Sequence, residues 1–138
     1  MMEKILIALN MIVDFVESYE LIDEIDIATM LYKSGFEKYE IRQVLSYLDF
    51  GNFTPTNGVR YFSKSEKDKF TEAGMQYIQK LQLSGAVDLL VIEELIDRCM
   101  DVDGKVDVEN IKQTLLYILI ERRKLIDFDN GSMDEFVN

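Results

Sequence analysis

Residues 27–48 read IATMLYKSGFEKYEIRQVLSYL, and this stretch carries the clearest structural signal in the chain. Its apolar positions recur at helical spacing on both sides of Gly35, which predicts one helix over residues 25–34 and another over residues 37–49. Gly35 stands where a helix commonly ends in a left-handed residue. Phe36 can pack as a hydrophobic staple at the start of the next helix. The lengths and the glycine turn are those of a helix-turn-helix unit.

Helical spacing continues outward from this pair in both directions. One amphipathic helix is predicted before the pair, and four helices are predicted after it. Their expected ranges are residues 2–19, 64–70, 72–83, 87–99 and 108–123. Polar residues that commonly cap helices stand at three of the expected starts, with a glycine after one expected end. These residues are Ser63 with Glu66 as a capping box, Thr71, Asp107 and Gly85.

The helical pattern breaks over residues 50–58, which hold the one proline and two of the seven glycines. Residues 59–63 then show the β-branched and aromatic bias of a short strand, and their expected partner lies around residues 50–53. We therefore expect an all-α fold of six or seven helices with one small β-hairpin. The helix pair together with this hairpin predicts a winged-helix-like N-terminal half.

The same break is the best candidate for a division of the chain. It predicts a winged-helix-like helical part over residues 1–70 and a C-terminal helical part over residues 71–138. A length of 138 residues fits one domain or two very small ones. The two parts are expected to pack together and can form a single domain.

The composition excludes many kinds of catalytic site. The chain has no histidine and one cysteine, so it has no Ser-His-Asp triad, no Cys-His pair and no internal disulfide. The cysteine, Cys99, lies in an apolar helical stretch and is expected to be buried and inert. We expect no enzymatic activity, no cofactor and no metal site.

One loop has part of a calcium-binding pattern. Asp101 and Asp103 precede Gly104, as two ligands precede the glycine of an EF-hand loop. The positions of the first ligand and of the bidentate glutamate are occupied by Cys99 and Asn110. The loop is therefore expected to be a polar connection.

No segment reaches the roughly 18 uncharged apolar residues of a membrane span, and no secretory signal is expected at the N-terminus. The single cysteine favours a reducing compartment. We therefore expect a cytoplasmic protein without a membrane partner.

Charge is distributed unevenly. The net charge is −11, but residues 51–84 have 5 basic and 3 acidic residues, which gives +2. Within ten residues this segment places Arg60, Lys64, Lys67 and Lys69 among aromatic residues. This basic cluster can be an ordinary solvated helix face, or it can contact nucleic acid or an acidic partner.

The helix-turn-helix pattern has two further interpretations besides a simple packed pair. It can contact DNA, or it can be a winged-helix-like unit that binds proteins. Glu37 and Glu40 stand among the first residues of the second helix, where base contacts would form, and phosphates repel them. Direct nucleic-acid binding is therefore not the leading interpretation.

Several aromatic residues are candidates for a protein interface, because aromatic side chains are enriched in interface cores. They are Tyr39, Tyr47, Phe50 and Phe53, together with Tyr19. A homodimer could use the same residues. The alternative is that these rings belong to the core.

Six segments resemble one known family. They are MIVDFVESY at residues 11–19, LYKSGF at 31–36, IRQVLSYL at 41–48, RYFSKSE at 60–66, and the helical stretches 91–97 and 107–112. In these segments the chain resembles the Smg family, small bacterial proteins grouped as a domain of unknown function. The resemblance implies a cytoplasmic bacterial protein with no assigned reaction, and it associates the family with nucleic-acid transactions. None of the shared segments is a catalytic motif.

The function is not determined by the sequence. The leading hypothesis is a non-enzymatic protein-interaction module or adaptor, with an unidentified protein partner. The alternative is a winged-helix-type nucleic-acid-associated regulator or DNA-processing accessory. A small hydrolase that uses carboxylates alone is a third, weaker hypothesis.

Overall fold

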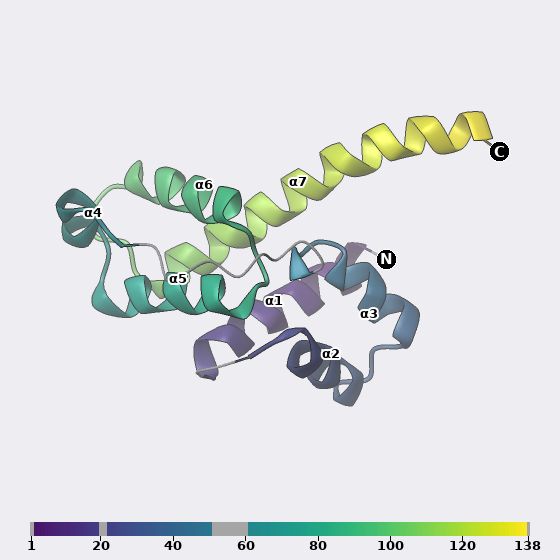
Figure 1. Ribbon diagram of the computed structural model, residues 1–138, viewed down its shortest axis with the longest axis horizontal. Coiled ribbons are helices and arrows are strands. Elements are labelled where there is room, and N and C mark those ends of the chain that lie inside the picture. Colours follow the sequence, from purple (N-terminus) through teal and green to yellow (C-terminus); the bar gives the residue numbers. More distant parts are fainter. Residues whose placement is uncertain (1, 20–21, 51–60, 138) are drawn as a thin grey trace.

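The computed structural model describes residues 2–19, 22–50 and 61–137, with side chains described from Glu3 to Arg122 within those ranges. These residues form seven helices, which Figure 1 shows as a packed body crossed by the long last helix. The helices are α1 (Met2–Ser18), α2 (Glu24–Lys33), α3 (Lys38–Leu45), α4 (Lys64–Lys69), α5 (Glu72–Ser84), α6 (Leu89–Met100) and α7 (Val108–Val137).

Helix α1 forms the centre of the packing. It contacts α2 and α3 from the N-terminal half and α5 and α7 from the C-terminal half. Its apolar face carries fully buried residues such as Ala8 and Val16. The Tyr77 hydroxyl of α5 donates a 2.8 Å hydrogen bond to the Val13 carbonyl of α1. The buried side chains of both halves consequently form one continuous hydrophobic core.

A buried lysine also joins α7 to α1. The Lys112 ammonium is almost fully buried, and its ion-pair partners are Asp14 and Glu17 of α1 and Glu109 of α7. Burial lowers the pKa of Lys112, but the hydrogen bonds that its ammonium donates to the three carboxylates outweigh that effect and raise the pKa above its usual value. Lys112 is therefore a permanent cation with a structural role.

The all-helical prediction is confirmed for the described residues, and all seven expected helices are present. The predicted hairpin is not confirmed, because residues 51–60, which include most of it, lie outside the described residues. Residues 61–63, the end of its second predicted strand, are not in a strand. Across the described ranges, the β pairing outside helices is an isolated parallel bridge between Phe70 and Val106.

Two helices end at different places from those expected. Helix α3 stops at Leu45, four residues early, because the chain beyond it is held by another part of the fold. The Asp49 amide donates to the Ala86 carbonyl at 2.8 Å, which is incompatible with a continued helix. Helix α7 continues past the expected end at residue 123 to Val137.

Candidate functional site

Helix α2 has two apolar faces. The inward face buries Ile27 and Leu31 completely in the core. The outward face presents Ile25 and Tyr32, which are 73% and 65% exposed, and these residues stand two helical turns apart with Ala28 between them. A surface helix usually has one apolar face, so the second one requires an explanation.

A groove lies along this outward face, between α2 and α3. It has a volume of about 530 Å³. Its lining residues are Ala28, Thr29, Tyr32, Lys38, Ile41, Arg42 and Leu45. We refer to this site as the α2–α3 groove. Its floor is apolar, and the two cations Lys38 and Arg42 come from the exposed side of α3.

Local sequence fixes how α2 and α3 meet at this groove. Helix α2 begins with a capping box in which Asp23 and Asp26 accept hydrogen bonds from each other's backbone amides. It ends at Lys33, and two residues later Gly35 has a φ of +100°, a conformation that glycine adopts without strain. The buried Phe36 then donates its amide to the Leu31 carbonyl at 3.1 Å, which closes the turn.

An ion pair holds α3 against α1 from the opposite side. Lys4 of α1 lies 2.5 Å from Glu40, whose side chain is 7% exposed. Glu40 also accepts a 2.9 Å hydrogen bond from the Glu37 amide. Both partners hold the pKa of Glu40 below its usual value, and the Glu37 amide has a larger effect than the Lys4 ammonium. Glu40 is thereby directed away from the groove.

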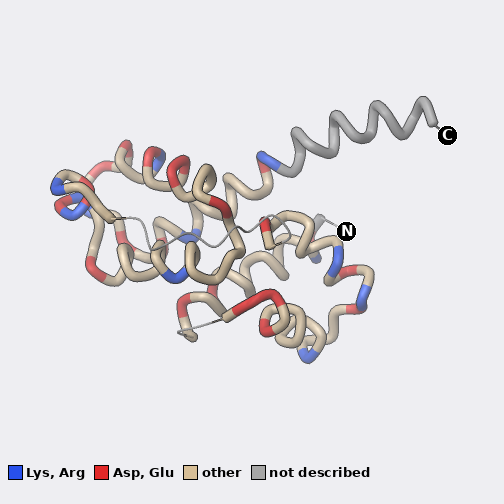
Figure 2. The backbone as a smooth tube through the Cα atoms, viewed as in Figure 1, with Lys and Arg blue, Asp and Glu red and all other residues tan. Residues whose placement is uncertain are grey.

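The two cations at the groove, Lys38 and Arg42, are consequently available to bind a ligand. Within the described part of the chain, neither Lys38 nor Arg42 has an ion-pair partner. Residues 27–48 contain three basic and two acidic residues in a chain whose net charge is −11. Figure 2 shows basic and acidic positions alternating along α3, with a further basic position near the end of α2. The groove therefore suits an apolar ligand with carboxylates.

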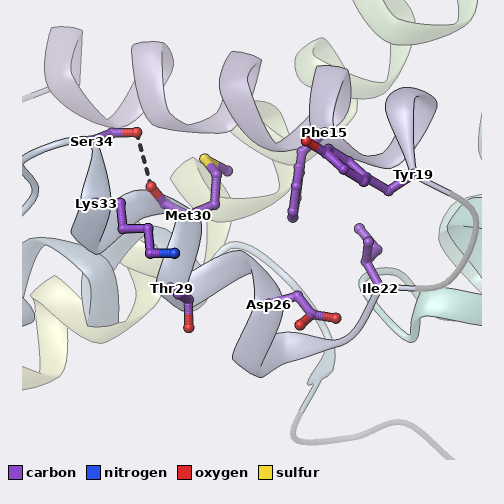
Figure 3. Close-up of a pocket in the computed structure, with 8 residues that line it drawn as sticks. All are labelled: Phe15, Tyr19, Ile22, Asp26, Thr29, Met30, Lys33 and Ser34. Carbon is purple, nitrogen blue, oxygen red and sulfur yellow. Dashed lines mark hydrogen bonds between the residues drawn. The ribbon is translucent and has the colours of Figure 1, made fainter.

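A second pocket lies on the other side of α2, facing the end of α1. It has a volume of about 550 Å³, and its lining residues are Phe15, Tyr19, Ile22, Asp26, Thr29, Met30, Lys33 and Ser34. Figure 3 shows the Phe15 and Tyr19 rings at one end and Lys33 at the other. The two rings make an edge contact at 4.6 Å between centroids. With this pocket, α2 has hollowed surfaces on both flanks.

The structure separates the aromatic residues that were expected to form an interface. Tyr39 is half exposed, and Tyr19 is exposed at the second pocket. Tyr47 belongs to the buried core, and Phe50 is partly buried against it. Phe53 lies outside the described residues. The predicted interface residues therefore differ in exposure, and the Tyr47 ring is buried.

The expected basic cluster is also divided. Arg60 lies outside the described residues, and Lys64 and Lys67 are exposed on the short helix α4. The Lys69 ammonium turns to the loop before α7 and donates a hydrogen bond to the Val102 carbonyl. Figure 2 shows acidic positions interspersed with basic ones around α4. The described part of the cluster has mixed charge.

Sequence reasoning missed the outward face of α2. It predicted the helix from its apolar spacing but did not single out Ile25 or Tyr32. The signal was present in the spacing, since these two residues are seven positions apart, at the same side of the helix. Lys38 and Arg42 were likewise not singled out as candidate site residues.

The described residues bear on three other kinds of functional site. They contain no group of three or more His, Cys, Asp or Glu residues arranged to hold a metal ion. None of their helices has both the length and the apolar character to cross a bilayer. Cys99 is fully buried, and burial raises the pKa of its thiol.

Comparison with known proteins identifies the family. The model of the family described as "Protein of unknown function (DUF494)" matches residues 4–135. The chain is 28% identical over 116 residues to the "Protein Smg homolog" of Nitrosomonas eutropha (strain DSM 101675 / C91 / Nm57), with 76% of each chain covered. No solved structure matches. Because the family match extends over nearly the whole chain, the protein belongs to the DUF494 family, the Smg proteins, whose function is unknown.

Proposed function

We propose that this protein is a non-enzymatic protein-interaction module and that the α2–α3 groove is its partner-binding surface. The observation that carries this proposal is the second apolar face of α2, where Ile25 and Tyr32 are largely exposed and Tyr32 lines the groove. Apolar residues that gather at one exposed site are typical of interaction surfaces. Large aromatic residues are also the usual anchors of protein interfaces.

The composition supports a non-enzymatic role. Without histidine the chain has no imidazole for acid–base chemistry near neutral pH. Its one thiol is buried and has a raised pKa, which disfavours the reactive thiolate form. The proposed location is the bacterial cytoplasm, where such a thiol stays reduced.

The test is an affinity purification of the tagged full chain from a lysate of its own cells, with and without nuclease. Tyr32→Ala is compared with Tyr117→Ala, a matched control because Tyr117 is 64% exposed on α7. We expect a protein partner that survives nuclease and is lost with Tyr32→Ala alone. Retention of every partner by Tyr32→Ala would contradict the proposal.

The alternative function is a winged-helix-type nucleic-acid-associated regulator or DNA-processing accessory. The exposed cations Lys38 and Arg42 on the second helix of the helix-turn-helix pair favour it. The wing would be the predicted hairpin that includes residues 51–60. This alternative predicts DNA binding that weakens steeply with salt and with Arg60→Ala or Lys64→Ala. If the protein does not bind DNA, or binds it independently of salt, this alternative function is ruled out.

A further inference from the structure

We propose that the α2–α3 groove of one copy binds the acidic C-terminal segment, residues 124–137, of a second copy. This inference rests on the proposed function of the groove and names its occupant. The chain would then form a dimer in which each copy gives one segment and receives one. Such a two-fold exchange closes on itself and leaves no groove unfilled.

Charge complementarity is the first argument. The groove has two cations, Lys38 and Arg42, with no ion-pair partner among the described residues. The chain as a whole is strongly acidic, so most surfaces of two copies repel each other. Attraction between copies is therefore favoured where a cationic site meets an acidic segment. Residues 124–137 contain four acidic residues and one basic residue, Lys124, so the segment has a net charge of −3.

The apolar content of the segment is the second argument. The acidic residues Asp127, Asp129, Asp134 and Glu135 are interspersed with apolar ones. The apolar residues are Leu125, Ile126, Phe128, Met133, Phe136 and Val137. At 3.6 residues per turn, most of these apolar positions share one side of a helix. An acidic amphipathic helix matches a groove with an apolar floor and a cationic edge, which is a common mode of recognition.

Length and connectivity favour a second copy over the same chain. Helix α7 is continuous from Val108 to Val137, so its last residues cannot turn back to α2 without breaking the helix. Fourteen helical residues span about 21 Å. The ten residues of α2 span about 15 Å, so the segment is long enough to cover the groove.

Cysteine cross-linking of the full chain tests the contact directly. Protein with Tyr32→Cys is mixed with protein carrying Phe136→Cys under mild oxidation. We expect a disulfide-linked heterodimer in at least about tenfold excess over the product from Tyr117→Cys with Phe136→Cys. Tyr32 and Tyr117 are equally exposed, so accessibility alone gives equal yields. Equal yields would overturn the proposal.

Charge reversal supplies an independent readout in sedimentation velocity, with full-length protein between about 1 and 200 µM. Arg42→Glu alone, and Asp134→Arg with Glu135→Arg, should each weaken dimerisation about tenfold, and their combination should restore it. Lys105→Glu, at an exposed cation in the loop before α7, is the control and should change nothing. A monomer over the whole range, or no restoration in the combined variant, would overturn the proposal.

The two proposals can fail separately. If the chain stays monomeric while Tyr32→Ala still loses a protein partner, self-association is refuted and the partner-binding role of the groove remains. If Tyr32→Ala loses no partner and no dimer forms, both are refuted.

Discussion

Arg122 of α7 donates two hydrogen bonds to the carboxylate of Asp49. Its Nη1 donates to Asp49 Oδ2 at 3.1 Å, and its Nη2 donates to Asp49 Oδ1 at 2.5 Å. The same carboxylate accepts a 3.1 Å hydrogen bond from the amide of Asp88, the residue just before α6. The hydrogen bond to Asp49 raises the pKa of Arg122, so the guanidinium stays protonated. The chain after α3 is thereby fastened to α6 and α7 at one point.

Asp49→Ala should therefore lower the free energy of unfolding by about 2–3 kcal/mol, because it leaves a partly buried guanidinium and the Asp88 amide without their acceptor. Urea unfolding at neutral pH measures this change. Glu121→Ala is the matched control, since Glu121 pairs with Arg98 at an exposed position of the same helix α7. That control should cost less than about 1 kcal/mol. Equal effects of the two variants would refute the structural role of Asp49.

Truncating a side chain should lower the stability of the fold on the inward face of α2 but not on its outward face. Leu31 is fully buried, so Leu31→Ala should cost about 3 kcal/mol of stability. Tyr32 is 65% exposed, so Tyr32→Ala should change stability by less than about 0.5 kcal/mol. Urea unfolding of both variants measures this contrast. A large loss with Tyr32→Ala would mean that its ring serves the fold and not a partner.

Acid should weaken the contact between α1 and α3. The pKa of Glu40 in the folded chain is below 4.5, its value without the fold. Its contribution is therefore fully present above pH 4.5 and is lost as the pH falls through the folded pKa. Wild type should be more stable than Glu40→Gln at pH 7, and the difference should shrink below pH 4.5. Urea unfolding at several pH values measures it, and a constant difference would contradict this account.

Cys99 should be protected from thiol reagents. It is fully buried, and burial raises the pKa of its thiol, so little reactive thiolate is available. We expect labelling by a maleimide to be slow in the native protein and rapid in urea. Mass spectrometry of timed samples measures the rates. Rapid native labelling would show that α6 and α7 separate readily.

Much of the fold could be predicted from the sequence, because short-range signals determine it. The capping box at Ser63 and Glu66, the Thr71 cap and the left-handed Gly85 are all confirmed. Each depends on a few neighbouring residues, so spacing alone reveals it. The inward positions of the helices followed from the same periodicity.

The remaining features depend on contacts between distant residues. The end of α3 is set by the hydrogen bond from Asp49 to Ala86, which no local pattern encodes. The burial of Tyr47 and the exposure of Tyr32 likewise depend on which neighbours reach each ring. The division near residues 50–58 stays a prediction, as does the hairpin there.

Site-specific photo-cross-linking in living cells tests most directly whether the α2–α3 groove binds a protein. A benzophenone amino acid replaces Tyr32 in one strain and Tyr117 in another, at positions that are 65% and 64% exposed. The account predicts a discrete cross-linked protein from position 32 and none from position 117. No product from position 32, or the same products from both positions, would contradict it.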